Sequence, residues 1–252
     1  MNFRFFYHLY SHKIFFWLFI ATFICQILFW KKTENIKPQF DIVPPAPSKY
    51  LISAISLGDN EFLFRILATR LQNSGDVFAG FLALKDYDYL RIYQWMTALD
   101  TLNNKSNLVP ALASYYYAQT QNKPDTIYLV NYLDEHSSKD IDANWWWMWQ
   151  ASYIAKNTLK DNDRALELAY KLSKNKAENA PIWTRELPAF LHEEMGDGCL
   201  AFGVITKLIK ESESGERQIK PEEMNFMRYF INERLAKLKK QKFDPRKCSK
   251  NT

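Results

Sequence analysis

The chain has 252 residues, of which 47% are hydrophobic and 16% aromatic, so it is long and apolar enough to bury a substantial core. Its seven glycines are few for an enzyme that depends on phosphate loops or tight strand turns, because those use the positive-φ freedom of glycine. The formal net charge is +5, and the positive excess lies near the C-terminus. We therefore expect no nucleic-acid binding by the rest of the chain.

The N-terminus predicts a membrane anchor. After a short tail, residues 1–13, the segment Ile14–Trp30 contains no charged residue and would span roughly 26 Å as a helix at about 1.5 Å per residue. A cleavable signal peptide is the alternative. The apolar run is bulky, however, and no pair of small residues follows it before the basic segment at Lys31, so an uncleaved transmembrane helix is favoured.

Two observations bear on which side of the membrane carries the body. Basic residues after the span, Lys31 and Lys32 among them, favour a cytoplasmic body by the positive-inside rule. A short basic tail before a single span is instead typical of a signal anchor that exports the chain behind it, and we expect the exported side. Cys199 and Cys248 leave the question open, because they could form a disulfide in an oxidising compartment or remain separate thiols in a reducing one.

The remaining chain divides into three parts. Residues 31–47 contain four prolines and are expected to form an extended spacer. Residues 48–233 show helical patterns with no sustained period of two, which predicts an all-α body. Residues 234–252 form a basic tail that could contact anionic lipid head groups or an acidic partner, or simply be solvated.

Polar residues and turns separate the predicted helices of the body. Asp161 is a suitable N-cap for the helix that follows it, and Gly196 suits a left-handed helix stop. The helices are expected within residues 57–76, 87–104, 107–121, 124–137, 143–159, 161–175, 181–196, 197–212 and 220–242.

These helices show a spacing of 36 residues. It separates Trp147 from Trp183 and Ala165 from Ala201, and we expect these four residues to pack between neighbouring units. A helix–turn–helix pair cannot bury its apolar face alone, so pairs that recur at a fixed spacing predict a stacked α-solenoid.

On these residues the chain resembles the tetratricopeptide repeat (TPR) family over roughly residues 108–211. The matching features are tryptophan early in the first helix of a unit, Ala151 four residues later and alanine at the start of the second helix. The chain departs from the family pattern in its spacing, in Leu187 at a position usually held by a small residue, and in lacking a proline at the end of each unit. The anchor, spacer and repeats together are similar to membrane-anchored bacterial TPR-like proteins, most of which have no assigned function. This resemblance implies the bacterial inner membrane, and the exported side expected from the N-terminal tail would then be the periplasm.

The segment "WWWMWQ" places four tryptophans within five positions. All four could be core residues, but Trp145 and Trp149 share one helical face and could line a binding groove, since tryptophan is enriched in interface hot spots. Arg65 and Arg70 lie in an apolar-rich helix. They could belong to an intramolecular ion-pair lattice or contact a partner.

No residues in the sequence have the spacing of a catalytic, metal or cofactor site. His8 and His12 are separated by one helical turn but lack carboxylate or cysteine companions, and "LHEEMG" lacks the second histidine of a zinc-protease helix. We therefore expect a membrane-tethered, non-enzymatic scaffold that binds a protein or peptide in an envelope complex. An accessory or assembly subunit, packed permanently in a membrane complex, is the alternative.

Overall fold

The computed structural model describes residues 3–33, 41–77, 80–215, 219–234 and 248. It divides into two compact units, Met1–Asp41 and Ile42–Thr252, and each is described here by itself.

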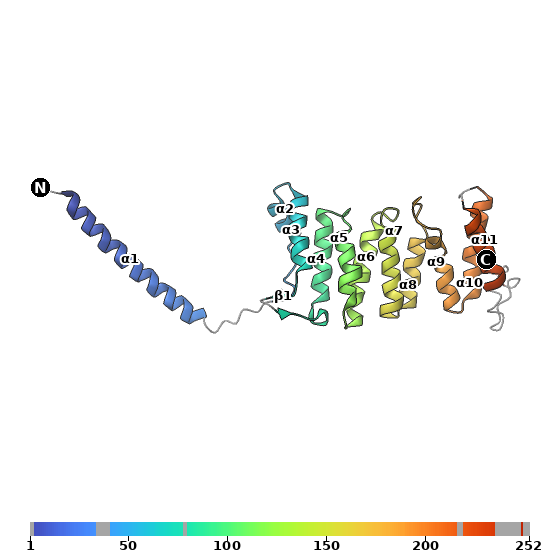
Figure 1. The fold of residues 1–252 in the computed structure, drawn as a ribbon, viewed down its shortest axis with the longest axis horizontal. Coiled ribbons are helices and arrows are strands. Elements are labelled where there is room, and N and C mark those ends of the chain that lie inside the picture. The colour runs from blue at the N-terminus through green and yellow to red at the C-terminus, as the bar shows by residue number, and fades with distance from the viewer. Residues whose placement is uncertain (1–2, 34–40, 78–79, 216–218, 235–247, 249–252) are drawn as a thin grey trace. The chain divides into compact units, whose positions relative to one another are not determined.

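The first unit contains one long helix, α1 (Phe3–Thr33) (Figure 1). Its part from Lys13 to Thr33 is apolar and is not buried against protein. This part is long and apolar enough to cross a membrane, and a signal sequence has the same properties. The predicted span Ile14–Trp30 is therefore helical throughout, and its exposed apolar surface is consistent with a signal anchor or a signal sequence.

Helices make up the regular structure of the second unit's described residues apart from one small hairpin, as the sequence predicted. The α-helices are α2 (Lys49–Ser56), α3 (Asn60–Gln72), α4 (Tyr89–Leu102), α5 (Leu108–Ala111), α6 (Thr126–Ser138), α7 (Trp145–Ile154), α8 (Asn162–Leu172), α9 (Trp183–Glu194), α10 (Gly198–Glu213) and α11 (Pro221–Tyr229). Shorter helical segments are η1 (Leu84–Asp86), η2 (Leu112–Tyr116), η3 (Tyr117–Gln119), η4 (Lys123–Asp125), η5 (Ala155–Leu159) and η6 (Phe230–Arg234).

Several helices extend without a break into the short segment that follows. The α5–η2–η3 run, the α7–η5 run and the α11–η6 run each form one continuous rod (Figure 1). Successive rods pack side by side in chain order, and α7 packs on α6 before it and on α8 after it. The body is thus a row of neighbouring helices.

Local sequence determines where these helices begin and end. Asp161 Oδ1 accepts a hydrogen bond from the backbone N–H of Arg164 at 2.9 Å, and Asp59 and Asp88 cap α3 and α4 in the same way. Such caps satisfy N–H groups that have no partner within the helix. Gly196 has φ +85° at the end of α9, so both the cap and the left-handed stop expected from the sequence are present.

The hairpin pairs β1 (Asp76–Val77) with β2 (Gly80–Phe81) in antiparallel register. Gly75, just before it, has φ +88°, and the Tyr87 ring occupies the space that a Cβ atom would need there. The Tyr87 hydroxyl donates to the carbonyl of Ser74 at 2.6 Å. Only glycine meets both requirements at this bend.

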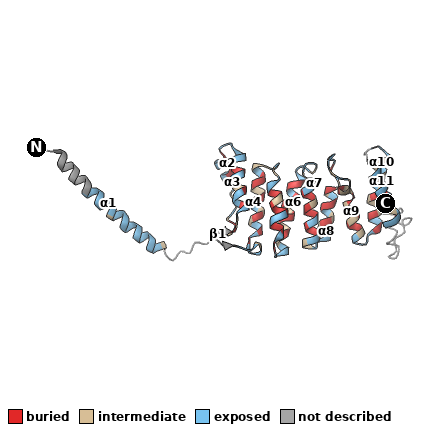
Figure 2. Cartoon of the chain, in the orientation of Figure 1, coloured by how far each residue is buried: buried red, intermediate tan, exposed pale blue. Residues whose placement is uncertain are grey.

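Two hydrophobic clusters form the core, and the interior faces of the helices are buried (Figure 2). The larger runs from Val43 to Leu191. The smaller lies among α9, α10 and α11 and includes Cys248, which forms a disulfide with Cys199. This pairing decides between the two possibilities left open by the sequence, and a disulfide is typical of an extracytoplasmic body.

Two buried carboxylates connect helices that are not adjacent in the row: one connects α4 to α6, and the other connects α6 to α8. Asp100 on α4 accepts a hydrogen bond from the Tyr132 hydroxyl on α6, and His136 Nδ1 lies 2.8 Å from its other oxygen. Asp134 on α6 forms ion pairs with Arg164 and Lys171 on α8, the latter at 2.7 Å.

The folded unit begins earlier than the expected boundary at residue 48. Val43 is buried, Arg91 Nη1 donates to its carbonyl at 2.9 Å, and Trp95 Nε1 donates to the carbonyl of Pro44 at 2.8 Å. The end of the proline-containing segment thus belongs to the body. The residues of the spacer at 34–40 lie outside the described part, as does the basic tail except for Arg234 and Cys248.

Candidate interaction surface

Aromatic side chains from three alternate rods, α5–η2–η3, α7–η5 and α9, form one connected surface, here called the aromatic face. Its members are Tyr115, Trp145, Trp146, Trp149, Tyr153 and Trp183. Tyr115 and Tyr153 are each 51% exposed and Trp146 is 37% exposed, whereas the other three are partly buried. The face therefore combines fixed rings with rings that solvent reaches.

Helical spacing and ring contacts hold the face together. Trp146 and Trp149 are three residues apart on α7, and their ring centres lie 4.7 Å apart. Trp149 also contacts Tyr153 at 5.8 Å and Trp183 of α9 at 5.6 Å. The edge-to-face and tilted geometries are those that aromatic pairs prefer.

Hydrogen bonds anchor the face to the α5–η2–η3 rod, which lies two rods before α7. The Tyr115 hydroxyl of η2 accepts from Trp146 Nε1 at 2.8 Å and from Gln150 Nε2 at 3.0 Å. By contrast, the indole N–H groups of Trp145, Trp149 and Trp183 have no hydrogen-bond acceptor within the described residues. The face thus offers hydrogen-bond donors beside an apolar surface.

The face also lacks charge where it is densest. Neither α7, "WWWMWQASYI", nor η2, "LASYY", contains an Asp, Glu, Lys or Arg residue. An uncharged surface of this kind favours apolar and hydrogen-bonding contacts over ion pairing.

Trp147 differs from the other tryptophans of α7. It is buried, its Nε1 donates to Asn107 Oδ1 at 3.0 Å, and its ring centre lies 6.2 Å from that of Tyr115. Trp183 contacts Trp145 and Trp149, so each of Trp147 and Trp183 rests on the rod two before its own.

Two of the predicted packing residues are alanines, and both Ala165 and Ala201 are fully buried. The Ser152 hydroxyl of α7 donates to the carbonyl of Ala165 at 2.9 Å. Because α7 and α8 approach closely at Ala165, a larger side chain there would clash with α7.

Arg65 and Arg70 lie on α3 and are not part of the aromatic face. Arg65 Nε is 2.8 Å from Glu61 Oε1, and this hydrogen bond lowers the pKa of Glu61. The Arg70 guanidinium lies 6.0 Å from the centre of the Trp95 ring. The structure thus places Trp145 and Trp149 together and these two arginines elsewhere in the row (Figure 1).

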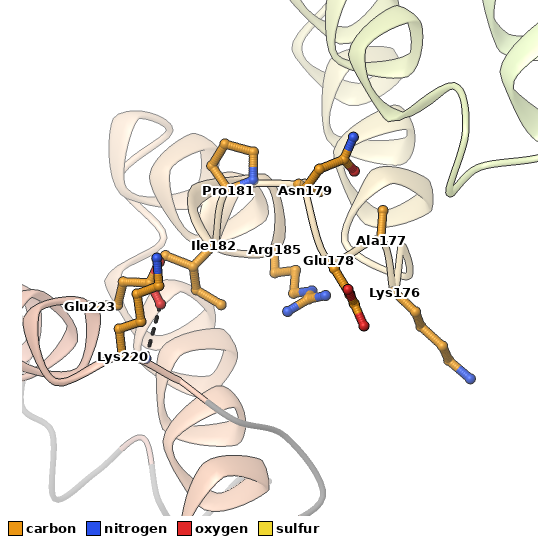
Figure 3. Close-up of a pocket in the computed structure, with 10 residues that line it drawn as sticks. Lys176, Ala177, Glu178, Asn179, Pro181, Ile182, Arg185, Lys220 and Glu223 are labelled. Atoms are coloured by element: carbon orange, nitrogen blue, oxygen red, sulfur yellow. Dashed lines mark hydrogen bonds between the residues drawn. The ribbon is translucent and has the colours of Figure 1, made fainter.

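An open cleft of about 840 Å³ lies between the α8–α9 connection and the start of α11 (Figure 3). Charged side chains of both signs line it, among them Lys176, Glu178 and Glu223. The backbone N–H of Lys220 donates to Glu223 Oε2 at 3.2 Å. The mixed signs favour no single charge on a ligand.

Glu186, near the cleft on α9, is buried, and no partner is found for its Oε1 atom. Burial, and secondarily the negative charge of Glu223, raises the pKa of Glu186 to about 7. Ionisation of this side chain therefore costs stability.

Within the described residues, no group of three or more His, Cys, Asp or Glu side chains could hold a metal ion. The side chains of His8 and His12 lie outside the described part.

No family model, curated protein or solved structure matches this chain.

Sequence reasoning selected Trp145 and Trp149 but did not select Trp146, Tyr115 or Tyr153. Trp149 and Tyr153 are four residues apart, so helical spacing alone could have joined them. Tyr115 is 31 residues before Trp146, and the link between them became visible only in the folded chain.

Proposed function

We propose that this protein is a membrane-tethered, non-enzymatic scaffold whose helical body binds a protein or peptide partner through the aromatic face. The single observation that carries the proposal is the connected surface, uncharged along α7 and η2, with Tyr115, Trp146 and Tyr153 as its exposed members. Exposed clusters of aromatic side chains are typical of interaction sites, and tryptophan and tyrosine are enriched among the residues that contribute most to binding.

A TPR-like solenoid is the architecture we propose for the body. Two observations support it. The Asp100–His136 contact spans 36 residues, and the comparable Asp134–Lys171 contact spans 37 residues. Contacts of one kind at nearly one spacing are what stacked helix pairs would produce.

The tether and the location are part of the same proposal. We place α1 in the bacterial inner membrane as an uncleaved anchor and the body in the periplasm. The Cys199–Cys248 disulfide supports an oxidising compartment, and the exposed apolar surface of α1 supports a lipid environment.

Site-specific crosslinking tests the proposal. A photoreactive amino acid replaces Tyr153 in the full-length chain, and a matched variant carries it at Tyr50, which is 88% exposed on α2, outside the aromatic face. We expect a discrete crosslinked partner from position 153 and none from position 50 after irradiation of intact cells. Equal yields from both positions, or none from position 153, would contradict a role for the aromatic face.

The alternative, a permanently packed subunit, predicts a different behaviour of the same sample. A subunit would co-purify in fixed stoichiometry without crosslinking and would aggregate when expressed without its complex. A scaffold remains soluble in detergent by itself and captures its partner reversibly.

A further inference from the structure

We infer that the aromatic face binds an extended, uncharged, proline-rich peptide segment. The inference rests on the proposed function and adds the chemistry of the ligand. It is carried by the way this body already holds a proline-rich segment of its own chain.

That segment is Ile42–Pro47, "IVPPAP", which forms neither helix nor strand. Two carbonyl groups fasten it to α4, one accepting from Arg91 and the other, that of Pro44, accepting from the indole N–H of Trp95 at 2.8 Å. Proline residues favour an extended conformation whose carbonyl groups point outward without internal partners. An indole N–H beside an apolar ring is a suitable contact for such a carbonyl.

The aromatic face offers the same kind of contact, repeated. The ring of Trp183 contacts the rings of Trp145 and Trp149, and the N–H groups of these three indoles have no acceptor among the described residues. Trp146 and Trp147 differ, because their N–H groups already donate to Tyr115 and Asn107. Three rings with available donors suit a ligand that supplies apolar surface and carbonyl groups in alternation.

The lack of charged side chains on the aromatic face also favours an uncharged ligand. Since α7 and η2 contain no ionisable Asp, Glu, Lys or Arg side chain, a strongly acidic or basic peptide would lose hydration there without gaining an ion pair. Proline removes backbone N–H groups from the ligand, so few of its donors would be left unsatisfied against a face that itself supplies donors. Proline-rich segments bind aromatic-lined grooves on these grounds, with little conformational entropy to lose.

The test uses the full-length protein in detergent micelles and a fluorescently labelled, uncharged peptide with proline at most positions. A glycine–serine peptide of equal length is the control ligand, and fluorescence anisotropy reports binding. We expect saturable binding of the proline-rich peptide only.

Two variants locate the site. Trp149→Phe keeps an aromatic ring but removes the indole N–H, and we expect binding to weaken roughly three- to tenfold, as for the loss of one hydrogen bond. Trp17→Phe, in α1, removes an indole N–H far along the sequence and should leave binding unchanged. Circular dichroism of both variants verifies that the helical content is retained.

Three outcomes would overturn the inference: equal binding of the two peptides, unchanged binding by Trp149→Phe, or tighter binding of an acidic peptide or an oligosaccharide. If any of these occurs while position 153 still crosslinks a partner, the ligand chemistry is wrong and the proposed function stands. If position 153 also fails to crosslink, both fail.

Discussion

Replacement of Glu186 by glutamine should stabilise the protein, and more so as the pH rises. Glu186 lies in the first turn of α9 with 1% of its surface exposed, and its Oε1 atom has no partner among the described residues. Ionisation there requires a charge to leave water, with the carboxylate of Glu223 close enough to oppose it. Burial first, and Glu223 second, raise the pKa of Glu186 to about 7 from an ordinary 4.5.

The sign of the effect follows from proton linkage. Between pH 4.5 and about 7 the folded protein holds a proton on Glu186 that the unfolded chain has released, so the free energy of unfolding falls as the pH rises through this window. At about 1.36 kcal/mol per pKa unit, the full cost above pH 7 is roughly 3 kcal/mol. Glutamine cannot ionise and avoids this cost.

Urea denaturation of the full-length protein, followed by tryptophan fluorescence at pH 4.5 and pH 8, measures the effect. We expect Glu186→Gln to resemble the wild type at pH 4.5 and to be about 2–3 kcal/mol more stable at pH 8. Glu223→Gln should give a smaller gain, because it removes the secondary cause. Glu222→Gln is the matched control, because Glu222 is exposed and lies next to Glu223 on α11. The reasoning would be refuted if the free energy of unfolding changed between pH 4.5 and pH 8 by the same amount in the wild type and in Glu186→Gln.

Three further predictions follow from the packing. Loss of the Cys199–Cys248 disulfide, which links residues separated by 49 positions, should lower the stability of α10 and α11 by up to about 4 kcal/mol, and hydrogen exchange should show faster exchange there than in α6. Trp147→Ala should cost about 3–5 kcal/mol in chemical denaturation, whereas Trp145→Ala should cost clearly less; equal costs would mean that both are core residues. Asp100→Ala should cost about 3–5 kcal/mol near neutral pH, because it leaves His136 and Tyr132 without their buried partner. That cost should shrink as the pH falls below 3.8, since hydrogen bonds and charge from His136 and Lys139 outweigh burial and keep the pKa of Asp100 below that value.

Helix positions could be predicted because their signals are local. Asp161 caps the start of α8, and Gly196 ends α9. Each does so through its own backbone or residues only a few positions away. The apolar character of Ile14–Trp30 is likewise a property of consecutive residues, and that segment is helical in the structure.

The start of the body could not be predicted in the same way. Proline clustering at Pro44, Pro45 and Pro47 is typical of a spacer, yet Val43 and Pro44 are fastened to Arg91 and Trp95. Those partners lie 48 and 51 residues further along the chain. No pattern within the spacer itself reports such contacts.

The tryptophan segment shows the same limit within a single helix. Four indoles in five positions must point in several directions, so the sequence predicts that some are buried and some are not. Their neighbours decide which. Asn107, 40 residues before Trp147, accepts its indole N–H and fixes it in the interior, and Tyr115 does the same for Trp146 at the surface. Trp183, from α9 two rods further along, covers Trp145 and Trp149 only in part. Three rods thus jointly produce the property that makes the aromatic face a candidate binding surface, which is that its rings are held in place while several of them stay exposed. A substitution at Tyr115 should therefore alter the face as much as one on α7 itself.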